Sequence, residues 1–527
     1  MRRKTSPKFQ CVTLGYLQPQ DKAQRFMKGS RLAAMALAAL PLAAAIPAWA
    51  STTYYWDAGG TPSQTGGGNG TWDTSTANWD SGGTNVPWVN GSGSYANFVA
   101  NSTTGTYAVT VASAASITAG SLTYTPISDA YGVTIGAASG TTASLDIGTL
   151  YVSTHGGTMV FGGSATGTDG TLAVTIGKVD NTNATDLSAG VAVLGSGVTV
   201  NLTGSNTGLV GVAAGTANIS VVGGFGSSLV FRGGTINTLA DMVSGVSIGE
   251  LAGSITFGGG HSLELTNSGA APIDNGAPVG TIATVLSNTT VQWDGNENNN
   301  STSTQGAAAT LEKSGPGTLI LTGKYYSGGA TTVSAGTLEV DGSFANNAEL
   351  VQASASTVAS AFTVDSSATL QGTGSIAGTT TVDSGGILAP GTALASAGHS
   401  SGTTLTLAGG ATLDSGSVLD FTLGSASDLI STAALTLNQD ITVNVTQGAG
   451  FGPGTYQLIG YTGLTDNSAG FSGWTVNGLS GLNYSLSNDT AAKAIDLTVS
   501  PVPEPATLGL LGVGGLGLLI GRRRKMA

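Results

Sequence analysis

A short phrase of alternating apolar and small polar residues recurs along most of the chain. It has the form Gly-Thr-Leu-x-Val, or a close variant, at Gly148–Val152, Gly170–Val174, Gly317–Leu321 and Gly336–Val340. Because successive side chains of a strand point to opposite faces, this period of two predicts short strands with one buried face. Glycine, asparagine, serine and aspartate fill the gaps, as turns require. The pattern predicts an all-β protein.

The spacing of these phrases predicts how the strands are arranged. The phrase that begins at Gly317 returns at Gly336, and the one that begins at Ala368 returns at Gly386. A repeat of roughly this length, about 20 residues, is typical of one coil of a parallel β-helix. Each coil buries its leucines and valines by stacking on the next one. We therefore expect a parallel β-helix (β-solenoid) over residues 111–430, followed by a C-terminal β region over residues 431–500.

Aromatic residues gather ahead of the predicted solenoid, within residues 51–110. Four tryptophans lie there: Trp56, Trp72, Trp79 and Trp88. The open end of a solenoid must be covered, so an aromatic-rich N-terminal cap is the favoured interpretation. The alternative is a set of exposed rings that stack on sugars. Exposure of the tryptophans separates the two.

Residues 1–50 have the features of a secretory signal peptide. Lys28 and Arg31 precede an alanine-rich apolar run, and the small residues Ala48 and Ala50 stand at the expected cleavage positions. The region before this run is unusually long, and a start at Met27 would give a signal of conventional length. We expect an exported protein that is cut after Ala50.

The C-terminal residues 501–527 form a polar tag, an apolar stretch and a basic cluster. Residues 506–521 carry no charge and would span roughly 24 Å as a helix, short of a bilayer core of about 30 Å. Snorkelling and local thinning accommodate such a segment. We expect a single C-terminal transmembrane helix. The basic residues that stop it are Arg522, Arg523 and Arg524.

Charge and cysteine content narrow the function classes. Between Ser51 and Gly521 stand five basic and 28 acidic residues, a formal charge of −23. So acidic a body argues against nucleic acid and against direct adhesion to anionic lipid. Cys11 is the one cysteine and lies in the predicted signal peptide. The mature protein would therefore have no disulfide, thiol nucleophile or thiolate metal site.

The tail resembles the PEP-CTERM sorting signal of Gram-negative bacteria in order, spacing and position. The sorting motif is formed by Pro503, Glu504 and Pro505. The resemblance implies recognition by an exosortase, a membrane-embedded cysteine transpeptidase that would process the tail near this motif. It also implies delivery of a membrane-anchored precursor to the cell surface or extracellular matrix, in a host that makes exopolysaccharide.

Residues 311–342 resemble the autotransporter-associated β-strand (PATR) repeat. The segment runs from Leu311-Glu312-Lys313-Ser314-Gly315 through the turn at Tyr326-Ser327-Gly328-Gly329 to Gly336-Thr337-Leu338-Glu339-Val340. The resemblance implies a right-handed parallel β-helix of passenger type. It implies a scaffold rather than an activity.

Candidate catalytic and metal residues are sparse. The histidines His155, His261 and His399 stand apart in glycine- and serine-rich loops, where solvent exposure is the favoured interpretation. Paired carboxylates at Asp414 and Asp420 are a weaker alternative, of the kind that glycoside hydrolysis uses. Residues 294–305 begin like a calcium loop, but the glycine and glutamate that such a loop needs are replaced by Asn299 and Gln305. No metal site, cofactor or catalytic residue is predicted.

These patterns together predict an exported structural protein of the cell surface or extracellular matrix. Its expected partners are an exosortase and exopolysaccharide in a biofilm. One alternative is an adhesin or glycan-binding protein, in which the tryptophans would contact sugars. Another is a carbohydrate-active β-helix enzyme, in which paired aspartates would cleave a polymer.

Overall fold

The computed structural model describes residues 51–502 with interruptions. Residues 1–50 and 503–527 lie outside it. The interruptions are residues 61, 63, 65, 101–104, 127–130, 153–157, 163–169, 181–191, 196, 204–209, 213, 220–228, 232, 252, 268–280, 295–296, 299–309, 327–328, 346–360 and 392–401. The predicted signal peptide and transmembrane helix therefore fall outside the described residues. All regular elements within the described part are strands, as expected.

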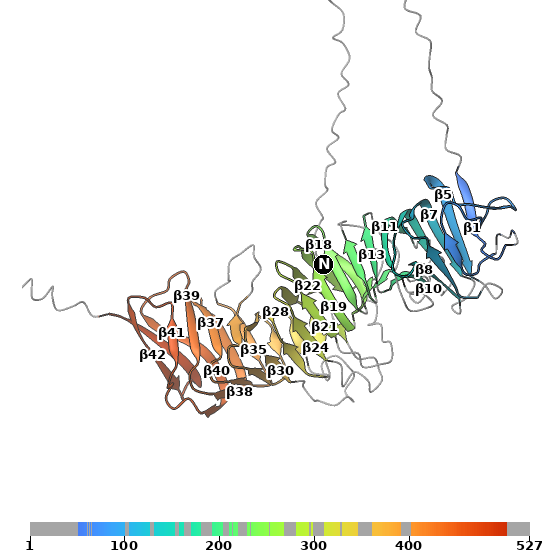
Figure 1. Cartoon of the computed structure of the whole chain (residues 1–527). Helices are drawn as coiled ribbons and strands as arrows, with labels where there is room; N and C mark the ends of the chain where they lie inside the picture. The colour runs from blue at the N-terminus through green and yellow to red at the C-terminus, as the bar shows by residue number, and fades with distance from the viewer. Residues whose placement is uncertain are drawn as a thin grey trace, which may run out of the picture. The chain divides into compact units, whose positions relative to one another are not determined.

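Most strands of the first sheet, called sheet A here, stack in parallel along the chain (Figure 1). Successive strands of this stack come from successive coils. In stacking order they are β1 (Thr52–Trp56), β5 (Gly91–Ala100), β7 (Ser116–Pro126), β9 (Thr142–Val152), β11 (Thr171–Asp180), β13 (Val198–Leu202), β15 (Thr216–Ile219), β17 (Gly234–Thr238), β19 (Gly253–Gly258), β21 (Thr281–Val285), β24 (Leu311–Ser314), β27 (Thr331–Val333), β30 (Phe362–Val364), β33 (Thr380–Val382), β36 (Ala411–Leu413), β38 (Leu429–Leu437) and β40 (Gly454–Asp466).

The second sheet, sheet B, is also parallel and takes one strand from each coil. Its strands are β2 (Gly70–Trp72), β6 (Tyr107–Val111), β8 (Gly132–Ala137), β10 (Thr158–Phe161), β12 (Ala192–Leu194), β14 (Val210–Val212), β16 (Leu229–Phe231), β18 (Met242–Leu251), β20 (Ser262–Asn267), β22 (Thr290–Asp294), β25 (Thr318–Leu321), β28 (Gly336–Val340), β31 (Ala368–Gly372), β34 (Ile387–Pro390), β37 (Val418–Leu423), β39 (Thr442–Gln447) and β41 (Thr475–Asn477).

The C-terminal coils add a third strip of short strands. They are β23 (Glu297–Asn298), β26 (Lys324–Tyr326), β29 (Ser343–Ala345), β32 (Ser375–Ile376) and β35 (Thr404–Leu407). The long strand β38 joins this strip to sheet A, because its first half pairs with β35 and its second half with β36.

Two of the coils have the length of the repeat seen in the sequence. Leu319 of β25 pairs with Leu338 of β28, and Leu370 of β31 pairs with Leu388 of β34, so paired residues are separated just as the repeated phrases are. All four leucines are buried and stack in one column. Fully burying one leucine contributes about 1.5–3 kcal/mol relative to leaving it exposed. These columns of stacked apolar side chains therefore stabilise the contact between successive coils. The predicted β-solenoid is confirmed.

The alternation of residues along each strand produces this core. Strands β6 and β13, with sequences YAVTV and VTVNL, alternate buried and half-buried positions without a break. Thr110 of β6 and Thr199 and Asn201 of β13 take outward positions, where β-branched or hydrogen-bonding side chains suit a wetted sheet face, and Ala108 takes the fourth. Parallel pairing begins before residue 111, at β1 and β5, and continues past residue 430 to β41.

The two ends of the solenoid are built differently. At the N-terminal end, β1 is covered by the short antiparallel strands β3 (Trp79–Asp80) and β4 (Asn85–Val86). At the C-terminal end, sheet A continues beyond β40 through two antiparallel strands. These are β43 (Ala494–Pro501), which pairs with β40, and β42 (Leu482–Asp489), which pairs with β43.

A search of the described residues finds no helix with the length and apolar character to span a bilayer. The predicted transmembrane segment at residues 506–521 lies outside the described residues.

Candidate functional site

The predicted processing residues fall outside the described part of the chain. These are Ala48 and Ala50 at the signal cleavage site, Pro503, Glu504 and Pro505 of the sorting motif, and the basic residues Arg522, Arg523 and Arg524. The structure does show where the sorting segment begins. Pro501 ends β43, and Val502 after it is 50% exposed.

The four N-terminal tryptophans are buried together rather than displayed. Trp79 is fully buried, and its ring centroid lies 4.8 Å from that of Trp88, 4.9 Å from Trp72 and 5.1 Å from Trp56. Phe98 of β5 closes the cluster, with its ring centroid 5.4 Å from that of Trp79. Rings packed at these distances fill the first coil, so they offer no face to a sugar.

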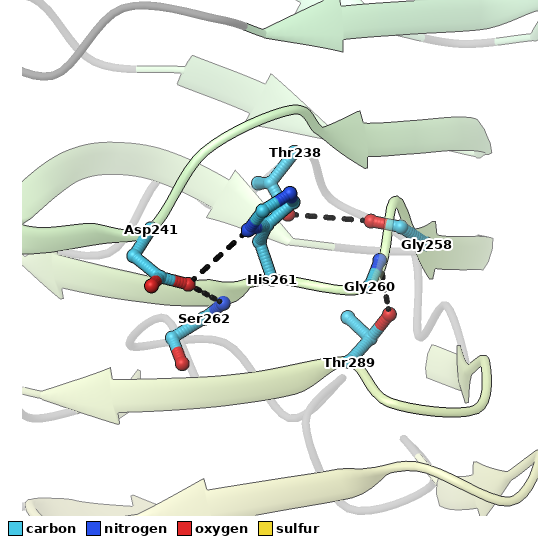
Figure 2. Close-up of polar contacts among 7 residues, drawn as sticks. All are labelled: Thr238, Asp241, Gly258, Gly260, His261, Ser262 and Thr289. Carbon is cyan, nitrogen blue, oxygen red and sulfur yellow. Dashed lines mark hydrogen bonds and ion pairs between the residues drawn. The ribbon is translucent and has the colours of Figure 1, made fainter.

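A polar corner surrounds the one histidine that the structure describes. His261 precedes β20 and Asp241 precedes β18, and Figure 2 shows their side chains facing each other across adjacent coils. His261 Nδ1 lies 3.4 Å from Asp241 Oδ1. The same carboxylate oxygen accepts a hydrogen bond from the Ser262 amide at 2.9 Å. The His261 side chain is 39% exposed, in agreement with an exposed loop histidine.

Two buried threonines secure the backbone behind this corner (Figure 2). Thr238 Oγ1 donates to the Gly258 carbonyl at 3.3 Å, and the Gly260 amide donates to Thr289 Oγ1 at 3.1 Å. The bond from the Ser262 amide, together with His261, lowers the pKa of Asp241. The corner thus stabilises a turn. Within the described residues, no hydrogen bond joins the side chain of His261 or of Asp241 to a serine or threonine hydroxyl.

The carboxylates Asp414 and Asp420 face different neighbours. Asp414 follows β36 and accepts a hydrogen bond from Asn438 Nδ2 at 3.4 Å. Asp420 lies within β37 of the other sheet and accepts from Asn444 Nδ2 at 2.8 Å. These bonds assign the two carboxylates to separate hydrogen-bond ladders, one on each sheet.

A column of aspartates and asparagines, which we call the Asx column, follows the strands of sheet A in the C-terminal coils. It consists of Asp365, Asp383, Asp414, Asn438 and Asn467, each standing after the last paired residue of its rung. Each of the three aspartate amides donates to a carbonyl of the preceding coil. Desolvation and the neighbouring charges of Asp365 and Asp414 raise the pKa of Asp383. Parallel registry brings these carboxylates together from three successive coils.

Lys313 is a buried cation within the segment that resembles the PATR repeat. Its Nζ donates to the carbonyls of Ser314, Gly315 and Ala335 at 2.9, 2.9 and 3.0 Å. Its side chain is fully buried, and desolvation lowers the pKa of Lys313 to about 8. The lysine ties the turn after β24 to the turn after β27. The sequence pattern alone did not predict burial of Lys313, because lysine is rarely an inward-facing residue.

A second buried polar pair lies on sheet B. Gln371 Nε2 of β31 donates to Glu339 Oε2 of β28 at 2.6 Å, and both side chains are buried. The two positions are register neighbours. Sequence reasoning missed the pair, because each residue follows an inward-facing leucine and alternation therefore predicts that its side chain points outward.

Metal ligation finds no support in the part of the chain that the structure describes, where no group of three or more histidines, cysteines, aspartates or glutamates gathers. The calcium-like segment begins at the end of β22, and Asn299 and Gln305 lie outside the described residues.

Comparison with known proteins gives two family matches and one relative. A family model described as Passenger-associated-transport-repeat matches residues 311–340. A model described as PEP-CTERM protein-sorting motif matches residues 501–525. The relative is Adhesin BmaC autotransporter of Brucella suis biovar 1 (strain 1330), 31% identical over 173 residues. The aligned part covers 32% of this chain and 5% of that protein.

These matches place the chain in a class. It is a β-solenoid that carries a PATR repeat and ends in a PEP-CTERM sorting motif, as the sequence predicted. The sorting motif and the autotransporter adhesin relative together support an exported, cell-surface protein.

Proposed function

We propose that this chain is a non-enzymatic structural protein of the cell surface or extracellular matrix, sorted by an exosortase. The observation that carries the proposal is the PEP-CTERM match at residues 501–525, which begins at the last residue of the solenoid. The solenoid is the delivered part, and the sorting segment is the part that the exosortase removes.

The position of the sorting segment supports processing. Pro501 is paired with Leu482 in the terminal hairpin, whereas Val502 is half exposed. A processing enzyme needs an accessible peptide, and Val502, directly before Pro503, is exposed. The apolar residues 506–521 and the basic cluster after them would hold the precursor in the membrane until cleavage.

Intact-mass measurement of the protein isolated from its own host tests the proposal. We expect a mature chain that starts at Ser51 and ends close to Pro503–Pro505. A protein that still carries residues 522–527 at the cell surface would refute processing. In a variant with Glu504→Ala and Pro505→Ala we expect retention of the tail. The matched control is Ser500→Ala, an exposed residue directly before the matched segment, which should be processed normally.

Association with exopolysaccharide in a biofilm is the second part of the proposal. The formal charge of −23 between Ser51 and Gly521 favours a neutral polymer, or an acidic one bridged by divalent cations, over direct binding of a polyanion. Co-sedimentation of the mature protein with the host polymer, with and without a chelator, distinguishes these modes. Absence of the protein from the matrix fraction in both conditions would reject the association.

An adhesin is the alternative function, favoured by the similarity to Adhesin BmaC autotransporter. Burial of Trp56, Trp72, Trp79 and Trp88 means that adhesion would use other surfaces than these rings. Loss of cell or surface attachment on deletion of the gene, with the matrix otherwise intact, would favour the adhesin.

The carbohydrate-active enzyme is the weaker alternative. It requires cleavage of the host polymer that disappears in the Asp414→Asn and Asp420→Asn double variant. We expect no cleavage by the unmodified protein.

A further inference from the structure

Strand β42 is the last strand of sheet A at the C-terminal end of the solenoid. It pairs with β43 in an unbroken antiparallel register from Leu482↔Pro501 to Asp489↔Ala494. Among the described residues, β43 is the one strand that pairs with β42. The other edge of β42 therefore presents a row of backbone N–H and C=O groups along the end of the sheet.

This edge lacks the devices that usually block sheet extension. At the opposite end of the solenoid, sheet A finishes in β3 and β4, which have 2 residues each. Strand β42 is four times longer and contains no proline or lysine. Its one charged residue, Asp489, is the final one. Short strands, charges and prolines are how natural sheets avoid edge pairing, and β42 has almost none of them.

The two faces of β42 are distinct. Leu482 and Leu486 pack against the core, and Tyr461 Oη donates to Asn488 Oδ1 at 2.6 Å on the same face. The opposite face carries Asn483, Ser485, Ser487 and Asp489, all exposed. A strand added to this edge must keep apolar side chains on the inner face and polar ones on the outer face.

We propose that the free edge of β42 pairs with β42 of a second copy of this chain. A two-fold axis perpendicular to the sheet makes the two strands antiparallel and keeps each face with its counterpart. Of the registers that satisfy this condition, the two with the longest overlap are centred on Ser485 and on Leu486. The first puts Ser485 opposite Ser485 of the second copy, and the second puts Ser485 opposite Ser487. Neither register places two charges opposite each other, so a second copy fits this edge.

The exit of the sorting segment favours a second copy as the occupant. Because Pro501 pairs with Leu482, residue 502 leaves the fold beside β42. If the tail holds the precursor in the membrane, as the proposed function states, the β42 edge of every copy lies at the same distance from the membrane surface. Confinement of this kind raises the effective concentration of one edge for another. The edge itself does not depend on that function.

Sedimentation of the exported chain, residues 51–527 in detergent, tests the pairing. We expect a dimer for the unmodified chain. The S485K/S487K variant places like charges opposite each other in both registers and should weaken association by roughly tenfold or more. The matched control T363K/T412K adds the same charge at outward positions of β30 and β36, which are two coils apart and have neighbours on both sides. It should dimerise like the unmodified chain.

Cross-linking locates the contact independently of charge. Cys11 precedes residue 51, so the exported chain is free of cysteine and a single one can be introduced. Ser485→Cys should give a covalent dimer with a bismaleimide that spans about 8 Å, the reach of directly opposed and diagonal pairs. Thr381→Cys, on an interior strand of the same sheet, should give no covalent dimer.

A monomer in sedimentation, or equal cross-linking of the two cysteine variants, would overturn the proposal. A monomer whose β42 amides are protected from hydrogen exchange would mean that another segment of the same chain occupies the edge, and this also refutes pairing between copies. The C-terminal mass of the host protein reports separately on exosortase processing, so failure of one proposal leaves the other measurable.

Discussion

Gly336 opens β28 with a φ of +65°, a backbone conformation that favours glycine. A Cβ at this position would lie within 2.4 Å of the Gly315 carbonyl oxygen and 2.6 Å of that of Gly317. Gly336 is therefore needed for two reasons, the turn into the strand and the close approach of the preceding coil.

Gly336→Ala is expected to lower the free energy of unfolding by about 2–3 kcal/mol, because it combines a left-handed backbone with a steric clash. Denaturant titration measures the change. Gly452→Ala is the control, since nothing lies within 4 Å of a Cβ there, and its effect should stay within about 0.5 kcal/mol. Equal effects of the two substitutions would contradict this account.

Lys313 shows that an inward-facing charge is tolerated when the backbone supplies its partners. Its Nζ reaches three carbonyls of two successive turns. Lys313→Met keeps the length of the side chain but leaves those carbonyls without their donor. We expect a loss of about 1–3 kcal/mol in the free energy of unfolding at pH 7.

The effect of pH on Lys313 has a definite sign. Burial lowers its pKa to about 8 from 10.5, so between these values the unfolded chain binds more protons than the folded one. Stability contributed by this group therefore rises from pH 8 to pH 10.5 and is lowest below pH 8. The stability difference between the unmodified chain and Lys313→Met should grow over that window. Burial raises the pKa of Tyr107 and of Tyr124, so these buried phenols stay protonated there. A difference independent of pH would contradict the assignment.

At the scale of strands, parallel registry turns scattered aspartates into the Asx column. The raised pKa of Asp383 reflects desolvation first and then Asp365 and Asp414 in the neighbouring coils. Since a raised carboxyl pKa means that ionisation opposes folding, this group alone makes the protein more stable as pH falls through its folded pKa.

Asp383→Asn should therefore stabilise the protein at pH 7 by a few tenths of a kcal/mol, the size expected for a solvent-screened like-charge pair. The gain should vanish below about pH 3, where Asp383 is protonated, and shrink in high salt. Thermal unfolding at pH 7 and pH 3 measures it. Destabilisation at pH 7 would show that the Asp383 carboxylate makes favourable contacts that outweigh the repulsion.

Strand content, and coil length where the phrases repeat closely, were predictable from the sequence. The columns of side chains were not. Alternation along a short strand, as in β6 or β13, reports which face is buried because strand geometry is local. The neighbours of Asp383 or Lys313 in the next coil depend on register across loops of variable length. Asp414 lies much farther along the chain from Asp383 than Asp383 does from Asp365. No fixed spacing in the sequence identifies that group.

Across the whole molecule, contacts run between successive coils, so stability should be local. Trp79→Ala removes the centre of the aromatic cluster at the N-terminal end and should cost about 3–5 kcal/mol there. Hydrogen exchange should show faster exchange in β1 and β5 and unchanged protection in β37 and β39. Trp474→Ala, at the C-terminal end, is the corresponding control and should instead speed hydrogen exchange in β39 and β41. Uniform loss of protection along the chain would contradict nearest-neighbour stability.

The sequence by itself determined the class of fold, the length of the coils whose phrases repeat closely, the PATR segment and the sorting signal. Each of these depends on residues that are close together in the chain, because alternation, turn-forming residues and motif spacing are local features of the sequence. Tertiary structure decided that the tryptophans are buried, that Lys313 lies among carbonyls, and that β42 is the last strand of sheet A among the described residues. These outcomes depend on which coil lies against which, and in a solenoid that contact is made by residues at least one whole coil apart in the chain.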